Sequence, residues 1–107
     1  MKLRAFSAIF VATLAVPQGK RTFTGTITDS MCPTGDHSHM KMGPTNAECT
    51  IACIQAHGAL YVLYDGKNAY TLSDQKKPQA FAGRKVKVVG ALDQSKRMIV
   101  VESVSSR

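Results

Sequence analysis

The side chains best suited to bind a metal ion are gathered in one part of this 107-residue chain. All three cysteines lie between residues 32 and 53, and all three histidines lie between residues 37 and 57. Thiolate and imidazole groups bind zinc, and with thioethers they also suit copper(I). We therefore expect a zinc or copper site whose favoured ligands are Cys32, His39, Cys49 and Cys53, with His37, His57, Met40 and Met42 as alternates.

The last two cysteines fall in a stretch with the signals of a helix. Residues 47–57 contain no Gly or Pro and carry apolar side chains at helical spacing. Thr45 or Asn46 can cap the beginning of this helix, and Gly58 can end it. We therefore predict a helix of about three turns after an irregular loop.

Spacing on this helix supports a shared ion. Cys49 and Cys53 are four residues apart, so their thiols leave one face about one turn apart. Cys32 and either His37 or His39 from the preceding loop would complete a tetrahedral set of three thiolates and one imidazole. The aspartates of this loop, at positions 29 and 36, are interpreted as turn formers or as acceptors for a histidine ligand.

A disulfide is the main alternative to a metal. In an oxidising compartment, Cys32 would pair with Cys49 or Cys53 and attach the loop to the rest of the domain. The two helix cysteines do not readily meet disulfide geometry at their spacing, so one thiol would be left over. This odd count favours the metal site over the disulfide.

A further copper interpretation comes from one spacing pattern. Cys49, Cys53 and His57 resemble the core of the binuclear copper motif in subunit two of cytochrome oxidase, which implies copper electron transfer. In that motif a Met follows the His by three residues, whereas this chain has Leu60 there. Residues 37–42 are similar to periplasmic copper-handling segments. The match to the binuclear copper motif covers only Cys49, Cys53 and His57 and lacks the surrounding cupredoxin fold, so copper electron transfer is less favoured than a metal-binding insertion.

The first residues are typical of a secretory leader. Lys2 and Arg4 precede the uncharged apolar stretch 5–16, which is shorter than the roughly 20 residues needed to span a bilayer. We predict a leader at 1–19, a mature domain at 20–107 that is periplasmic or secreted, and no membrane span in the mature chain.

Five stretches have the composition of β-strands and are separated by turn signals. Gly25 predicts a bulge in the first strand, and Asp65-Gly66 predicts a hairpin turn. The expected strands are 23–29, 60–64, 68–73, 86–92 and 98–104, with a loop-plus-helix insertion at 30–58 and a short connector at 78–82.

These elements predict a mainly β domain, a small five-stranded OB-like Greek-key barrel with the insertion after its first strand. An incomplete sandwich would give a similar pattern. Alternation predicts one core that contains Ile27, Leu63, Leu72, Val86, Val88, Ile99 and Val101, with Lys85 and Lys87 facing water.

Several segments resemble a family of small exported bacterial proteins of unknown function. The resemblance lies in FTGTITDSMC at 23–32, ECTIAC at 48–53, GALYVL at 58–63 and FAGRKVKVVG at 81–90. It implies an OB-like barrel with a D-x-x-C and C-x-x-x-C pattern, and it implies no activity.

The function classes can be ordered on these residues. Cys53 and His57 lack an acidic partner and an oxyanion element, so we expect no enzymatic activity. A second hypothesis is an accessory subunit that docks onto a larger envelope or extracellular complex, with its loop attached by a Cys32 disulfide. The net charge of +7 favours acidic partners, but the absence of Trp and of an aromatic cluster disfavours nucleic acid.

The leader generates the first testable prediction. Mass spectrometry of the protein from its native envelope should show loss of the first 15 to 19 residues, because Thr13-Leu14-Ala15 offers a small-residue cleavage site. Recovery of the intact chain from the cytosol would contradict export.

Overall fold

A computed structural model describes residues 19–107, so the predicted leader lies outside the described residues except for Gly19. The described elements are β1 (Arg21–Asp29), α1 (Asn46–His57), β2 (Tyr61–Tyr64), β3 (Ala69–Leu72), the 3-10 helix η1 (Lys77–Phe81), β4 (Lys85–Asp93) and β5 (Met98–Ser106). The prediction of a mainly β domain with five strands and one α-helix is confirmed. Within residues 19–107, no helix has the length and apolar content needed to cross a membrane.

The five strands form one sheet that closes on itself. Hydrogen-bonded neighbours follow the order β1-β2-β3-β5-β4, and β4 also pairs with β1. All pairs are antiparallel except β3 with β5, which are parallel. A register shift between Val89 and Gly90 bends β4 against β5.

The interior of the sheet holds the expected core. Val86 and Val88 on β4 are fully buried, whereas the alternating Lys85 and Lys87 are exposed, as predicted. Ile27, Leu63, Leu72 and Ile99 are buried in the same cluster, and Val101 packs against it.

Gly25 does not form the predicted bulge. Its pairing with Val86 continues the register on either side without a shift. A side chain at this position would instead overlap the backbone carbonyl of Tyr64, at the end of β2. Glycine is therefore needed at position 25, because the backbones of β1 and β2 approach closely where β1 stops pairing with β4 and begins to pair with β2.

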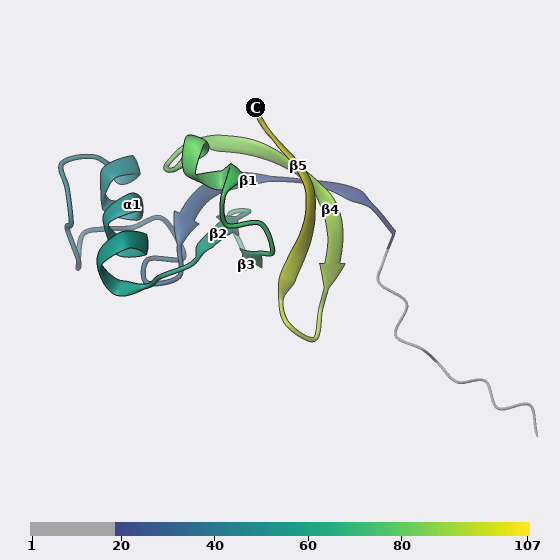
Figure 1. Cartoon of the computed structure of the whole chain (residues 1–107), viewed down its shortest axis with the longest axis horizontal. Coiled ribbons are helices and arrows are strands. Elements are labelled where there is room, and N and C mark those ends of the chain that lie inside the picture. Colours follow the sequence, from purple (N-terminus) through teal and green to yellow (C-terminus); the bar gives the residue numbers. More distant parts are fainter. Residues whose placement is uncertain (1–18) are drawn as a thin grey trace, which may run out of the picture.

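The helix α1 begins and ends as the sequence indicates. Thr45 is the N-cap, and its hydroxyl oxygen accepts the Glu48 N–H at 3.2 Å. Gly58 ends the helix in the left-handed conformation with φ of 65°. Figure 1 shows α1 and its preceding loop at one end of the molecule, beside the carboxyl end of β1.

Close backbone approach makes Gly25→Ala a test of the closed sheet. The added methyl group should force β1 and β2 apart and lower the free energy of unfolding by about 1–3 kcal/mol. Thr24→Ala, at an exposed position of the same strand, is the control and should change the free energy of unfolding by less than about 0.5 kcal/mol. Urea unfolding measures both, and equal stability of the two variants would contradict the close approach.

Candidate metal centre

The end of β1 turns sharply and brings Cys32 back beside Asp29. One carboxylate oxygen of Asp29, Oδ1, accepts the N–H groups of Met31 and Cys32, each at 3.0 Å. The Thr28 hydroxyl donates to the Cys32 carbonyl at 2.7 Å. The expectation that Asp29 forms a turn is confirmed.

A second turn directs His37 inward. The N–H of Gly35 donates to the Cys32 carbonyl at 2.9 Å, and Gly35 has a left-handed φ of 78°. His37 is only 6% exposed, and its Nε2 lies 3.4 Å from the hydroxyl of Thr50 on α1. This contact orients the imidazole ring so that its other nitrogen, Nδ1, faces Asp29.

Two buried polar atoms face each other across this turn without partners. Asp29 Oδ2 and His37 Nδ1 are 4.0 Å apart, which is too far for a hydrogen bond. Neither atom has a hydrogen-bond partner within the described residues. Unpaired buried polar atoms are rare because they lose their water without compensation.

Cys32 completes a compact group around these atoms. Ligand atoms of Asp29, Cys32 and His37 all lie within 4.8 Å of one another, and all three residues are buried. Carboxylate oxygen, thiolate sulfur and imidazole nitrogen are all zinc ligands, with bond lengths of about 2.0–2.3 Å. The described residues therefore contain a group that could hold a metal ion.

The two helix cysteines lie next to this group. Both are buried, and all three cysteines are free thiols. The thiol of Cys49 donates to the Gly43 carbonyl at 3.0 Å. Burial raises the pKa of the Cys53 thiol, and the nearby Asp29 carboxylate and Cys32 raise it further.

The same causes act on Cys32. Burial raises the pKa of its thiol, and the negative charge of Asp29 adds to that effect. Without a cation, both buried thiols therefore favour the neutral form. A bound metal reverses this preference, because a thiol that coordinates a metal loses its proton.

A cavity of about 290 Å³ adjoins the group, and His37, Lys41 and Cys49 contribute to its walls. His37 thus belongs both to the metal-binding group and to this cavity.

The structure separates the predicted ligands into two sets. Cys32, Cys49, Cys53 and the alternate His37 are buried together at this end of the molecule. His39, His57, Met40 and Met42 are exposed. Of the predicted cysteine and histidine ligands, Cys32 and His37 belong to the group with Asp29, whereas Cys49, Cys53, His39 and His57 do not.

Sequence reasoning did not propose Asp29 as a ligand. Its available signal was the D-x-x-C spacing, because an aspartate that bonds the turn through one oxygen leaves the other oxygen beside Cys32. Comparison of the chain with protein-family models, curated proteins and solved structures found no match.

Thr28→Val tests how this turn is held. The change keeps the shape of the buried side chain but removes its hydrogen bond to the Cys32 carbonyl, which still accepts from Gly35. We expect the free energy of unfolding to fall by about 0.5–1.5 kcal/mol in urea titrations. Thr24→Val, on an exposed position of the same strand, should stay within about 0.5 kcal/mol of the unchanged protein. A loss no larger than that of the control would contradict the role of Thr28.

Proposed function

We propose that this chain is an exported, non-enzymatic domain that binds one metal ion through Asp29, Cys32 and His37. The observation that carries the proposal is the pair of unpartnered buried atoms, Asp29 Oδ2 and His37 Nδ1, beside a buried thiol. An ion between them would satisfy both atoms at once and would offset the cost of their burial.

The composition of the group favours zinc over copper(I). Copper(I) prefers soft thiolate and thioether ligands, whereas a carboxylate is a hard oxygen ligand. The side chains of Met40 and Met42 are 36% and 37% exposed, whereas the three residues of the group are buried. Zinc accepts oxygen, nitrogen and sulfur together in one tetrahedral site.

Cys53 is the best candidate for a fourth ligand. It is fully buried, and the effects of Asp29 and Cys32 on its pKa reflect their proximity. The thiol of Cys49 instead donates a hydrogen bond to the Gly43 carbonyl. Four protein ligands would make a closed site of the structural type.

Such an ion would join three separate segments: the end of β1, the loop before α1, and α1 itself. The loop at 33–45 is largely exposed and contributes few apolar contacts, whereas Ala47, Ile51 and Ile54 of α1 pack against the core. Part of the free energy of metal binding would then be folding free energy for this end of the domain.

We further propose that the closed sheet is an OB-like Greek-key barrel and that the chain belongs with the small exported proteins that it resembles. The strand order, the parallel β3–β5 pair and the closure between β1 and β4 support that topology.

An accessory subunit is a second candidate function. Met31 and Leu60 are exposed by 41% and 46%, although both are large apolar residues. Met31 follows Ser30 in the chain, and Ser30 is hydrogen-bonded to Leu60. The Ser30 N–H donates to the Leu60 carbonyl, and the Ser30 hydroxyl oxygen accepts the Leu60 N–H, so Met31 and Leu60 lie on one surface. A protein partner would cover this surface. The version with a Cys32 disulfide has less support, because the three cysteines are free thiols.

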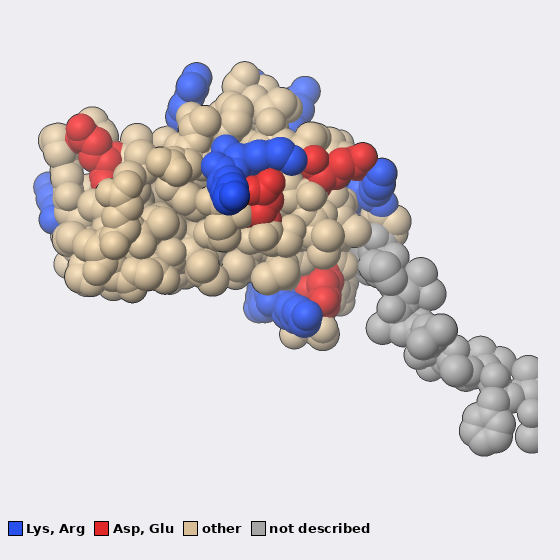
Figure 2. Space-filling model, viewed as in Figure 1, with Lys and Arg blue, Asp and Glu red and all other residues tan. Residues whose placement is uncertain are grey.

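Nucleic acid binding has little support from the surface charge. Figure 2 shows basic side chains spread over several parts of one face with acidic side chains among them. Some of these charges are paired, as in Lys20 with Glu102 at 2.9 Å and Lys77 with Asp74 at 3.5 Å. A nucleic-acid surface requires a more continuous basic stripe.

Metal titration of the purified chain tests the proposed function. We expect one zinc ion per chain by elemental analysis. His37→Gln and Cys32→Ser should lower zinc affinity by at least roughly 100-fold in chelator competition, since even indirect partners of ligands contribute 10- to 100-fold. His39→Gln is the matched control and should bind as the unchanged protein does, because His39 is exposed.

Three outcomes would contradict this assignment. Loss of zinc in His39→Gln but not in His37→Gln would favour the set of three cysteines and His39. Tighter binding of copper(I) with Met40 and Met42 required would replace zinc by copper. One free thiol and no metal would favour the disulfide.

A further inference from the structure

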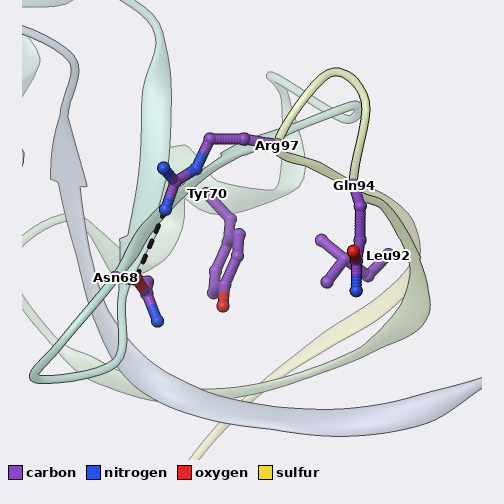
Figure 3. A pocket seen from close by; sticks show the side chains of 5 residues that line it. All are labelled: Asn68, Tyr70, Leu92, Gln94 and Arg97. Atoms are coloured by element: carbon purple, nitrogen blue, oxygen red, sulfur yellow. Dashed lines mark hydrogen bonds between the residues drawn. The ribbon is translucent and has the colours of Figure 1, made fainter.

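A second cavity lies between two hairpin turns and is formed without any residue of the metal centre. Its volume is about 260 Å³. One wall comes from the turn before β3, and the other comes from the end of β4 and the turn before β5. The lining residues are Asn68, Tyr70, Leu92, Gln94 and Arg97 (Figure 3).

Both turns are held by aspartate side chains. Asp65 Oδ1 accepts the N–H groups of Lys67 and Asn68 at 2.8 and 2.6 Å. Asp93 Oδ1 accepts the N–H of Ser95 at 3.0 Å and its hydroxyl at 2.6 Å. The carboxylates of these two turns are thus engaged within the turns themselves, and neither lines the cavity.

Arg97 is held in an unusual conformation at the cavity. Its φ of 48° lies in the left-handed region, which is uncommon for residues other than glycine. Its carbonyl oxygen accepts the Thr71 N–H at 3.0 Å, which fixes it to β3. This turn conformation and the bond to β3 fix the backbone of Arg97, whose side chain lines the cavity.

The guanidinium group keeps most of its hydrogen-bonding capacity. Arg97 reaches across to Asn68, where Nη2 donates to Oδ1 at 3.3 Å (Figure 3). This is the one side-chain hydrogen bond of Arg97 among the described residues. A guanidinium has five N–H donors in a planar arrangement that matches a carboxylate.

The remaining walls supply an apolar surface and neutral polar groups. Leu92 is buried, and the ring of Tyr70 packs at 6.0 Å from that of Phe23, which steadies it. Figure 3 shows Tyr70 between Asn68 on one side and Leu92 with Gln94 on the other. The cavity thus combines one cation, two carboxamides and an aromatic ring.

We propose that this cavity binds a small organic carboxylate with a ring-sized apolar body. The carboxylate would bind Arg97 and the amide of Asn68 or Gln94, while the ring would contact Tyr70 and Leu92. The volume is near the lower end for small-molecule sites, which suits a ligand of one ring. A single cation in the lining fits one negative charge better than a phosphate dianion.

Titration of the full chain by NMR, with benzoate, cyclohexanecarboxylate and glucuronate as probes, tests this proposal. At least one of them should shift the side-chain amide signals of Asn68 and Gln94. Benzamide, the neutral counterpart of benzoate, and inorganic phosphate should bind at least roughly tenfold more weakly, because they lack either the charge or the planar pair of oxygens.

Two variants locate the binding. Arg97→Gln should weaken binding roughly tenfold or more, since it removes a hydrogen bond to a charged group. Lys96→Gln is the matched control: it removes the same charge from the same turn but does not line the cavity, so its affinity should change less than about twofold. Unchanged amide spectra outside the turn would show that both variants remain folded.

Several results would overturn the proposal. These are no binding of any of the three carboxylates, equal binding of benzamide, tighter binding of phosphate, or an equal loss of affinity in Lys96→Gln and Arg97→Gln. The last result would mean that overall positive charge, and not the cavity, attracts the anion.

Discussion

The feature on which this molecule depends most is a buried carboxylate that has hydrogen bonds to only one of its two oxygens. Asp29 is fully buried, and removal of a charge from water costs several kcal/mol unless hydrogen bonds or an opposite charge replace the water. Its Oδ1 receives two N–H groups from the turn, whereas Oδ2 faces His37 without contact. A cation bound by Oδ2 and by His37 Nδ1 would compensate the carboxylate more fully, and the thiol of Cys32 alongside would be a further ligand for it.

The closed sheet is what keeps this carboxylate in place. Asp29 is the last residue of β1 and pairs with Tyr61 on β2. On the other side of β1, Ile27 O accepts the Gly83 N–H at 2.8 Å. Gly83 in turn lies against Ala47, where any side chain would collide with the first turn of α1. The position of the helix and the position of the carboxylate therefore depend on the same short segment of β1. Loss of a bound ion should loosen the loop at 33–45 while the sheet stays folded.

Local signals in the sequence predicted most elements but could not resolve contacts between distant segments. The helix predicted at 47–57 is found at Asn46–His57, because the cap at Thr45 and the end at Gly58 are encoded by neighbouring residues. The choice of His37 over His39 as the buried histidine depends on Thr50, thirteen residues away, to which no periodic pattern points. The role of Gly25 was wrongly assigned for the same reason, since its constraint comes from Tyr64 on another strand.

Burial distinguishes the energetic roles of the two sites. At the metal centre, Asp29, Cys32 and His37 have almost no exposure, so an ion there would act in a medium of low dielectric and would contribute to folding as well as to binding. Arg97 is exposed, so water stabilises its charge, and the attraction of the guanidinium for a carboxylate would strengthen only where a ligand displaced that water. A ligand at that cavity would therefore be recognised by shape and charge without becoming necessary for the fold.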